Sequence, residues 1–432
     1  MQDDKGISRR RVLKGAAAVA LPLAVPSSVL AGAENVPPSE RTTMGWIGTG
    51  GQGTRLLAGG SWAPEGGFIS RDRVHVSAVC DVNSKRREKA RSIVNEHYGN
   101  NDCDAYKDYR RLLAREDIDA VVIATGERWH PLISIDAARA GKDIYSEKPL
   151  TLTIREARVE KREIRRAGRV FQTGTQQRSS QAFRFACELV RNGYIGEVER
   201  AVVGVGGPPS NYYCTLPGQS EPDWLDYDMW LGQVPWRPYH EDFVFGWMGY
   251  RSCSGGGMTN WGAHHFDIAQ WGLGKDHTGP KEINPPGHEG CDVLTYRYED
   301  GKVITRNPGR LQQELGRGNG VLFIGSEGKV GVWRYQVKTW PEKVARVTID
   351  PDEERLYKSN DHYGNFLDCI RSRSRPVSDI GITHRSISIC HLGNIAYWLD
   401  RPLEWNPRDE HFVDGPVADR MLSRKKRSPW HL

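Results

Sequence analysis

Met44-Gly45-Trp46-Ile47-Gly48-Thr49-Gly50-Gly51-Gln52-Gly53 is the stretch that decides the fold expected for the N-terminal half. A short apolar strand ends at Ile47, and a G-x-G-x-x-G turn leads from it into a helix. Gly48 permits a tight turn, Gly50 lets the backbone approach a pyrophosphate, and Gly53 lets the helix pack closely. Because the first N–H groups of such a helix face the anion, the stretch predicts a dinucleotide-binding turn.

Asp81 stands at the carboxyl end of the next apolar strand, Val74–Cys80. It follows Gly53 by 28 residues, whereas the usual spacing is about 20. A Gly- and Ser-rich insertion between Gly59 and Arg73 accounts for the extra length. A carboxylate at this place accepts hydrogen bonds from the ribose hydroxyls of NAD, so Asp81 is expected to bind the cofactor.

The choice between NAD and NADP depends on the basic residues that follow this acid. Lys85, Arg86 and Arg87 could contact a 2′-phosphate, and Arg86 is counted among the cofactor-binding residues. The acid itself favours NAD, with NADP as the alternative. Gly51 and Gln52, within the turn, complete this set of expected contacts.

Strands and helices alternate through the first part of the chain. A continuous apolar strand is expected at Ile118–Thr125, a helix at Pro131–Ala140, and further strands at Asp143–Ser146 and Val170–Thr173. Strands that are apolar on both faces and separated by helices indicate a parallel sheet. We therefore predict an α/β, doubly wound Rossmann domain over residues 44–170.

The pattern changes beyond about residue 175, and residues 171–432 are expected to form an α+β domain. Helices are predicted at Phe183–Asn192, Asn260–Trp271, His362–Arg371 and Thr383–Leu399. The predicted strands are Val198–Val205, Cys291–Tyr298, Val303–Arg306, Gly320–Ile324, Val330–Tyr335 and Val344–Ile349. Strands in succession indicate a mixed or antiparallel sheet with helices on one face.

The N-terminus is typical of an export signal. Ser8-Arg9-Arg10-Arg11-Val12-Leu13-Lys14 precedes an apolar stretch from Gly15 to Leu30, and Ala31-Gly32-Ala33 offers a small-residue cleavage pattern. Twin arginines before a weakly hydrophobic segment predict a Tat signal peptide over residues 1–33, followed by a linker over 34–43. An uncleaved membrane anchor is the alternative, and two prolines in the short apolar stretch argue against it. A periplasmic or otherwise exported protein is expected.

Charge and cysteine content exclude other classes of protein. The net charge of the 432 residues is +6, and the leader carries half of it, with five Lys or Arg against two Asp. The rest is too small for a nucleic-acid-binding face, and the basic run Arg424–Arg427 is interpreted as a solvated tail. Eight cysteines occur without metal-binding spacing, so no metal site is expected.

Three further segments carry the functional prediction. They are Ala124-Thr125-Gly126-Glu127-Arg128-Trp129-His130-Pro131, then Glu147-Lys148-Pro149, then Asn260-Trp261-Gly262-Ala263-His264-His265-Phe266-Asp267. Together with the glycine turn, they resemble the glucose–fructose oxidoreductase/inositol dehydrogenase (Gfo/Idh/MocA) family from Met44 onward. The resemblance implies NAD(P)-dependent oxidoreduction, a second domain with a large, mostly antiparallel open sheet, and a homo-oligomer, dimer or tetramer.

The resemblance also implies catalytic roles. Lys148 would lie beside the nicotinamide, with Pro149 following a cis bond, and His264 would be the general base. Lys148 would stabilise a developing alkoxide while His264 takes the hydroxyl proton. This chain has Asn260 where the family commonly has Asp. Asn260 cannot act as a base, but it can bind substrate or orient His264, and Asp267 could supply a carboxylate one helical turn further on.

The remaining expected contacts surround this centre. The cofactor would also touch Thr125, Trp129, His130, Glu147 and Lys148. The expected substrate-binding residues are Gln176, Arg178, Tyr239, Asn260 and His264. Six tryptophans lie between Pro222 and Gly272, and flat aromatic faces beside polar groups suit a sugar ring.

We therefore predict a periplasmic NAD(P)-dependent dehydrogenase that acts on a sugar, glycoside or cyclic polyol. The first alternative is a glycosidase or lyase that retains its cofactor and works through transient oxidation of the sugar. Free NAD(P) is scarce outside the cytoplasm, which favours a tightly bound cofactor. The second alternative is a catalytically silent sugar-binding protein, for which the Asn260 substitution is the argument. No nucleic-acid partner and no membrane association beyond export are expected.

Overall fold

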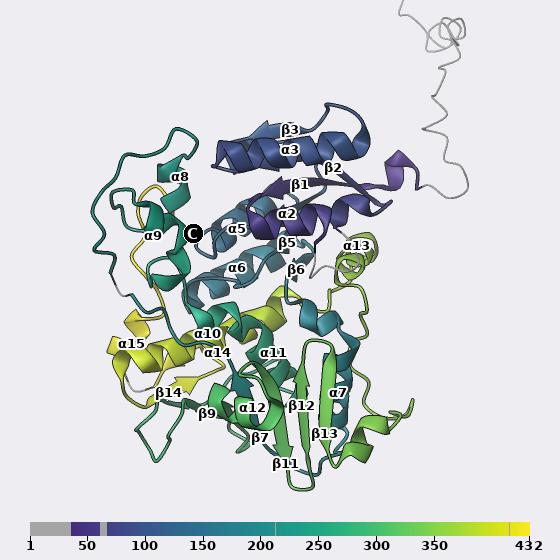
Figure 1. The fold of residues 1–432 in the computed structure, drawn as a ribbon, viewed down its shortest axis with the longest axis vertical. Helices are drawn as coiled ribbons and strands as arrows, with labels where there is room; N and C mark the ends of the chain where they lie inside the picture. Colours follow the sequence, from purple (N-terminus) through teal and green to yellow (C-terminus); the bar gives the residue numbers. More distant parts are fainter. Residues whose placement is uncertain (1–35, 61–66, 212, 414) are drawn as a thin grey trace, which may run out of the picture. The chain divides into compact units, whose positions relative to one another are not determined.

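Six parallel strands form the first sheet of the computed structural model, in the order β3-β2-β1-β4-β5-β6 (Figure 1). The structure describes residues 36–60, 67–211, 213–413 and 415–432, so the predicted signal peptide lies outside the described residues. The strands are β1 (Thr42–Ile47), β2 (Val74–Cys80), β3 (Asp104–Tyr106), β4 (Ala120–Ile123), β5 (Asp143–Ser146) and β6 (Phe171–Thr173). The parallel order confirms the predicted Rossmann sheet. The last strand of this sheet ends at Thr173, three residues beyond the domain boundary expected at residue 170.

Two of the helices between these strands begin at a capping side chain and end at a glycine. The helices are α2 (Gly51–Ala58), α3 (Ser84–Tyr98), α4 (Tyr109–Leu113), α5 (His130–Arg139) and α6 (Ile154–Ala167). The Asn83 side chain accepts from the Arg86 N–H at the start of α3, and Thr153 caps α6 through Glu156 N–H. Gly99 and Gly168 end these two helices in the left-handed conformation, which costs glycine little.

Nine strands form the second sheet, in the order β13-β12-β11-β7-β10-β9-β8-β14-β15. Only the β7–β10 pair is parallel among these strands, so the expected mostly antiparallel sheet is confirmed. The strands are β7 (Val198–Gly204), β8 (Glu282–Asn284), β9 (Thr295–Arg297), β10 (Val303–Arg306), β11 (Gly320–Gly325), β12 (Lys329–Trp333), β13 (Gln336–Trp340), β14 (Leu403–Asn406) and β15 (His411–Phe412).

Helices α7 (Gln181–Arg191), α11 (Gly262–Gly272) and α14 (Ile380–Leu399) pack on this sheet, and α14 also contacts α6 of the first domain. One apolar cluster runs through both sheets and these helices. Five shorter helices also lie in the described C-terminal part: α8 (Tyr227–Leu231), α9 (Glu241–Phe245), α10 (Gly257–Asn260), α12 (Pro308–Leu315) and α15 (Pro416–Arg420). The shared core fixes the two sheets against each other.

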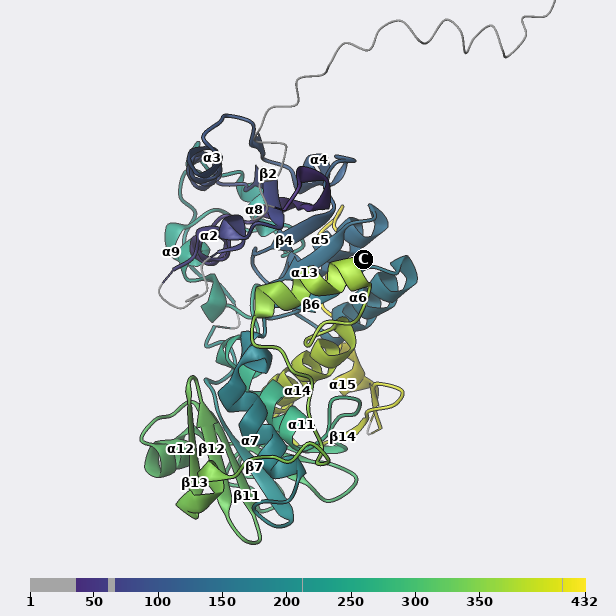
Figure 2. The same ribbon diagram turned by 90° about the vertical axis from the view of Figure 1, so that its right-hand side faces the viewer.

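Helix α13 (His362–Ser372) returns from the second domain to the first (Figures 1 and 2). Tyr363 stacks on Phe68 with ring centroids 4.5 Å apart, and Phe366 meets Tyr145 edge to face at 5.8 Å. These side chains belong to the apolar cluster on one face of the Rossmann sheet. The first domain therefore depends on residues almost 200 positions beyond its own last strand.

One strand prediction is wrong. Residues Val344–Ile349 are not a strand, because a 3-10 turn covers Glu342–Arg346 and an irregular segment follows it. The edge strand of the sheet is β13 instead, which pairs with β12 through Trp340 opposite Lys329. Val344 is buried, so its apolar character reflects packing rather than strand pairing.

The interpretation of Arg424–Arg427 as a solvated tail is also wrong. Lys426 Nζ lies 2.5 Å from Glu156 Oε1 of α6, and Arg427 pairs with Asp228 of α8. Further along, Trp430 is buried against Trp129, with ring centroids 4.8 Å apart. The tail is a packed part of the fold, and Lys425 alone in the run is exposed.

Other properties follow from the described part of the chain. All eight cysteines are free thiols, and only Cys214 among them is not buried. Within the same residues, no group of three or more His, Cys, Asp or Glu side chains is arranged to hold a metal ion. No helix among them combines the length and apolar character needed to cross a membrane.

Candidate cofactor-binding and active site

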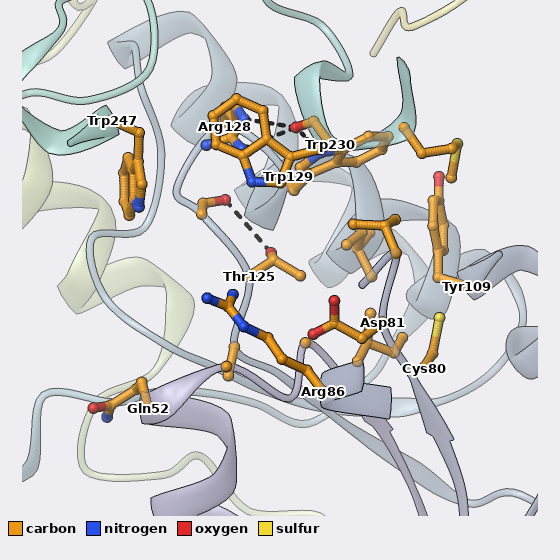
Figure 3. Close-up of a pocket in the computed structure, with 18 of the residues that line it drawn as sticks. Gln52, Cys80, Asp81, Arg86, Tyr109, Thr125, Arg128, Trp129, Trp230 and Trp247 are labelled. Atoms are coloured by element: carbon orange, nitrogen blue, oxygen red, sulfur yellow. Dashed lines mark hydrogen bonds between the residues drawn. The ribbon is translucent and has the colours of Figure 1, made fainter. Parts of the chain in front are cut away.

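A cavity of about 350 Å³ opens at the carboxyl ends of β1, β2 and β4 (Figure 3). Its floor is the glycine turn that follows β1, and Asp81 and Thr125 line it at the ends of the neighbouring strands. Open α/β sheets bind their ligands at this edge. The predicted residues found in its wall are Gly48, Gly50, Gly51, Gln52, Asp81, Arg86, Thr125 and Trp129.

Two glycines of the turn, Gly48 and Gly53, stand where any side chain would collide with the backbone. Gly48 has φ +90°, and a Cβ there would lie 2.6 Å from Ala124 O. A Cβ on Gly53 would lie 1.9 Å from Gly48 O, so this glycine lets α2 pack on the turn and does not itself line the cavity. Gly50 leaves room for a ligand beside Arg86 Nη1, 3.4 Å from its missing Cβ.

Asp81 holds the turn in place as well as facing the cavity. Its Oδ2 accepts hydrogen bonds from Thr49 N at 2.7 Å and Thr49 Oγ1 at 3.1 Å, and its Oδ1 accepts from Asn83 N. Among the basic residues that follow, Arg86 reaches into the cavity, whereas Lys85 lies over Trp224 and Arg87 donates to Asp81 O (Figure 3). The turn, the acid and this arginine fit a nicotinamide dinucleotide.

Residues 226–249, here called the covering segment, form the opposite wall of the cavity. They include α8, α9 and a 3-10 turn at Trp247–Gly249. The guanidinium of Arg128 lies 4.1 Å from the ring centroid of Trp230 and 5.5 Å from that of Trp247. It also donates to Trp230 O, at 2.8 Å from Nη2 (Figure 3). Arg128 therefore fastens this segment over the cavity.

The C-terminal tail fastens the same segment from outside. Lys426 Nζ donates to both Glu156 on α6 and Gln233 in the covering segment. The Arg427 backbone N–H donates to Gln233 O at 3.0 Å. Together with the packing of Trp430 on Trp129, these bonds connect the covering segment to the Rossmann domain.

Lys148 and Asn260 meet next to this cavity although 112 residues separate them. Lys148 follows β5, its peptide bond to Pro149 is cis as expected, and its Nζ donates to Asn260 Oδ1 at 2.7 Å. Burial lowers the pKa of Lys148, against the opposing charge of Glu147. Asn260 ends α10, and its Nδ2 lies 3.9 Å from Met248 Sδ of the covering segment.

His264 is buried on the first turn of α11, and its Nδ1 has no hydrogen-bond partner in the described chain. Burial lowers its pKa well below the ordinary value, and the charges of Lys148 and Arg334 lower it further. His264 is therefore a neutral imidazole at pH 7, which is the form that accepts a proton. The adjacent His265 stacks on Trp261 with ring centroids 5.5 Å apart.

Asp267, which could have supplied a carboxylate to His264, is bound to other groups instead. Its two oxygens accept from Arg178 Nε at 2.7 Å and Nη2 at 2.9 Å, and Ser386 Oγ donates to it as well. Arg178 also binds Asp276, and its side chain is 1% exposed. The substrate-binding role predicted for Arg178 is therefore wrong, because two carboxylates occupy its donors inside the core.

Tyr239 is likewise not placed for substrate binding. It belongs to the covering segment and is buried in the apolar cluster of that segment, edge to face with Tyr227 at 5.3 Å. Gln176, in contrast, lies near Lys148, because its Nε2 is 3.3 Å from Glu147 Oε1. Of the substrate residues predicted outside the α10–α11 motif, the structure brings only Gln176 to the active centre.

Glu147 and His130 connect the turn to Lys148 without lining the cavity themselves. Glu147 accepts from Gln52 Nε2 at 2.8 Å and from the Lys148 backbone N–H at 3.1 Å. The His130 ring lies between Thr125 O at 3.0 Å and Pro149 O at 2.7 Å. These bonds place Lys148 in a fixed position relative to the glycine turn.

Glu127 is a further buried acid, whose role the sequence reasoning did not predict. Its carboxylate accepts from Gly255 N at 2.8 Å and Thr259 Oγ1 at 3.3 Å, at the start of α10. Burial raises the pKa of Glu127 to about 7. The two hydrogen bonds of Glu127 hold the start of the short helix that ends at Asn260. Its position between Gly126 and Arg128 in the motif is the only signal that the sequence offered.

Fold and site together define a two-domain protein of the dinucleotide-binding α/β class. Residues 43–175 match the model of the oxidoreductase family's NAD-binding Rossmann fold, and residues 212–432 match that of the oxidoreductase family's C-terminal alpha/beta domain. The chain therefore belongs to the Gfo/Idh/MocA oxidoreductase family.

Relatives of known name match one part of the chain. Glycosyl hydrolase family 109 protein 1 of Shewanella sp. (strain MR-4) is 34% identical over 165 residues, which is 35% of each chain. The α-N-acetylgalactosaminidase of Shewanella oneidensis is 31% identical over 173 residues, again 35% of each. The match thus spans about a third of the length of these relatives.

Solved structures resemble the chain over most of its length. Myo-inositol 2-dehydrogenase from Lactobacillus plantarum has a TM-score of 0.57 at 18% identity, covering 84% of this chain and 99% of that one. The WlbA dehydrogenase from Bordetella pertussis, solved with NADH and UDP-GlcNAcA, has a TM-score of 0.55 at 17% identity, with 85% and 99% covered. At these identities the likeness establishes the shared fold.

Proposed function

We propose that this protein is an NAD(P)-dependent oxidoreductase acting on a CH–OH group of a sugar, glycoside or cyclic polyol. The observation that carries the proposal is the convergence of Lys148, Asn260 and the neutral His264 beside the glycine-turn cavity. The names of the structural neighbours, an inositol dehydrogenase and a dehydrogenase solved with a nucleotide sugar, agree with such substrates.

The cofactor would be held by the residues that fit it. The glycine turn would receive the pyrophosphate, Asp81 the ribose hydroxyls, and Arg86 any 2′-phosphate. NAD is favoured by the acid, with NADP as the alternative. A bound nicotinamide supplies the acceptor and donor of hydride. We also propose that the cofactor stays bound between turnovers, because the covering segment forms one wall of the cavity and Arg128 and the tail hold that segment in place.

The residues of this chain would handle the proton and the oxygen. Lys148 Nζ would donate a hydrogen bond to the substrate oxygen and stabilise negative charge there, as Asn260 holds the amine in position. His264 would take the hydroxyl proton, because its imidazole is neutral and its Nδ1 is unpaired within the described chain. Asn260 cannot share that proton, so His264 would act without a neighbouring carboxylate.

A second candidate function is hydrolysis or elimination at a glycosidic bond through transient oxidation of the sugar. The bonds by which Arg128 and the C-terminal tail hold the covering segment over the cavity favour it, since such a reaction returns a retained cofactor to its starting state. The names of the curated relatives, a glycosyl hydrolase family and an α-N-acetylgalactosaminidase, point the same way.

One experiment separates these functions. Mass spectrometry of the nucleotide that co-purifies with the full chain identifies the cofactor, and absorbance at 340 nm then follows its reduction with a panel of sugars and glycosides. Stoichiometric accumulation of reduced cofactor supports the dehydrogenase. Release of aglycone without accumulation supports the second function. If no sugar changes the absorbance and no aglycone appears, both are refuted in favour of a silent sugar-binding protein.

We further propose export through the twin-arginine leader and assembly into a homo-oligomer. The leader motif at Arg9–Arg11 supports export, which fractionation of cells that express the full chain and an Arg9→Lys/Arg10→Lys/Arg11→Lys variant would test. The nine-stranded sheet supports assembly by analogy with the family, and light scattering of the purified protein would test it. Mature protein in the cytoplasm only, or a monomeric mass, would refute the respective proposal.

A further inference from the structure

The turn between β12 and β13 brings an arginine from the second sheet to the active centre. The guanidinium carbon of Arg334 lies 5.1 Å from the ring centroid of Trp261, on whose face it rests. Trp261 directly follows Asn260, and its ring centroid is 5.8 Å from that of His264. The hairpin, green in Figure 1, therefore delivers a permanent positive charge next to the proposed base.

The guanidinium N–H groups of Arg334 have no carboxylate partner in the described part of the chain. Within the described chain, no carboxylate lies within ion-pair distance of it, and it is only partly buried. Arg178 shows the contrasting arrangement, because two aspartates occupy its guanidinium in the core. A guanidinium offers five donors in a planar fork, which matches a carboxylate. The stacking on Trp261 holds the Arg334 fork without using those donors.

The two buried acids near Lys148, Glu147 and Glu127, already accept hydrogen bonds from other groups. Glu147 is buried and accepts from Gln52 and Lys148 N, and Glu127 is buried and accepts from Gly255 N and Thr259. The other polar groups gathered around Asn260 and Trp261 are the Lys148 amine, His264 and Arg334. The charge of Arg334 also lowers the pKa of both Lys148 and His264. Glu147 and Glu127 oppose the charge of the Lys148 amine, so Arg334 is the cation of this corner without an ion-pair partner among the described residues.

We propose that Arg334 binds a carboxylate on the substrate, so that the substrate class is an acidic sugar such as a uronic acid or its glycoside. This assignment rests on the proposed function, because it places the sugar between Lys148 and Trp261. The carboxylate would pair with the guanidinium while the indole of Trp261 covers an apolar face of the ring. A neutral sugar of the same shape would leave the Arg334 donors without a partner.

Isothermal titration calorimetry on the full chain with its co-purified cofactor tests the assignment. The probes are methyl β-D-glucuronoside and methyl β-D-galacturonoside, each compared with its uncharged methyl ester. We expect the acid to bind about 10- to 100-fold more tightly than the ester, as for a hydrogen-bonded charged pair. Arg334→Ala should remove this difference by weakening the acid and leaving the ester unchanged. Arg334→Lys, which keeps the charge and loses the fork, should retain part of it.

Arg317→Ala is the matched control, because Arg317 also stacks on an indole, at 4.6 Å from Trp333, yet it is exposed and has no place in the site. Thermal melts of all variants report folding. The assignment is overturned if acid and ester bind wild type equally, if neither of them binds, or if Arg334→Ala leaves the acid as tightly bound as before.

Absorbance at 340 nm in the same samples separates this assignment from the proposed function. If the acid binds in a way that depends on Arg334, but absorbance does not change and no glycoside is cleaved, the carboxylate site is supported and the oxidoreductase function is refuted. Reduction of the cofactor by neutral sugars, with Arg334→Ala indistinguishable from wild type on acid and ester, keeps the function and refutes the carboxylate site.

Discussion

The glycine turn and the corner formed by Lys148, Asn260 and the start of α10 lie side by side but are built in different ways. The turn is made by residues within one short stretch, and the steric needs of its own backbone determine them: Gly48 at φ +90° and Gly53 against Gly48 O. The corner is made by Lys148 and Asn260, 112 residues apart, and by a helix start that the buried Glu127 holds. Backbone geometry shapes the first region, and side-chain partnership shapes the second.

The two regions should therefore respond differently to substitution. In the turn, an added methyl group collides with a carbonyl, so the damage should appear in stability and in cofactor content. In the corner, removal of a side chain leaves a fold with intact sheets, so the damage should appear in chemistry. Each of the following predictions tests whether the two regions respond in these separate ways.

The largest effect is expected from Lys148→Ala. Loss of the amine removes the hydrogen bond to the reacting oxygen, and kcat should fall about 10²- to 10⁴-fold. The measurement is the rate of cofactor reduction with the best sugar of the panel, alongside nucleotide content. Because Lys148 does not line the cavity, the nucleotide should be retained. A variant as active as the wild type would refute the proposed catalytic role of Lys148. A variant without bound nucleotide would show that Lys148 also helps to bind the cofactor.

Gly53→Ala should affect stability instead. Its Cβ would lie 1.9 Å from Gly48 O, and this backbone atom can move only if the turn and α2 separate. We expect a loss of about 2–4 kcal/mol in the free energy of unfolding, measured by denaturant titration, together with loss of bound nucleotide. Gly51→Ala is the control, because nothing lies within 4 Å of its missing Cβ, and its stability should change by less than about 0.5 kcal/mol. Equal stabilities for the two variants would contradict the steric account.

Lys426→Met should release the cofactor faster. The substitution leaves the buried Glu156 without its cation and frees Gln233 of the covering segment, at a cost of about 1–3 kcal/mol. We expect about a 10-fold faster loss of nucleotide in dilution experiments, since 1.4 kcal/mol corresponds to a factor of ten. Lys425→Met removes the same charge from an exposed neighbour and should leave the rate unchanged. A tail that matters only for folding would instead lower the melting temperature of Lys426→Met without changing nucleotide release.

The same contrast explains what the sequence could predict. The Rossmann order, the glycine turn and Asp81 follow from local motifs, and the Lys148–His264 pair follows from the family resemblance. The structure places them around one cavity and its neighbouring corner. The partners of a polar side chain do not follow in this way. Arg178 was expected at the substrate, but Asp267 and Asp276, 89 and 98 residues further on, occupy it.

Two other errors have the same origin. Val344 belongs to an apolar segment that the pattern assigned to a strand, but burial of its side chain within a 3-10 turn explains its character equally well. The basic run at the C-terminus looked solvated because its partners, Glu156 and Asp228, lie about 200 to 270 residues upstream. Charge alone does not tell a solvated face from a packed one when the compensating acids are distant in sequence.

The smallest expected effect concerns the residue in which this chain departs from its family. Asn260→Asp puts a carboxylate where Oδ1 now accepts from Lys148 at 2.7 Å. A nearby negative charge stabilises protonated imidazole and ammonium, so the pKa of both His264 and Lys148 should rise. In the wild type, burial and the neighbouring cations lower the pKa of His264, so the base is neutral well into the acid range. The acid limb of the kcat/KM profile should therefore move upward by about one pH unit in the variant, while an Arg317→Ala profile stays in place. An unchanged acid limb would mean that His264 does not carry the proton, and the corner would then owe its chemistry to Lys148 alone.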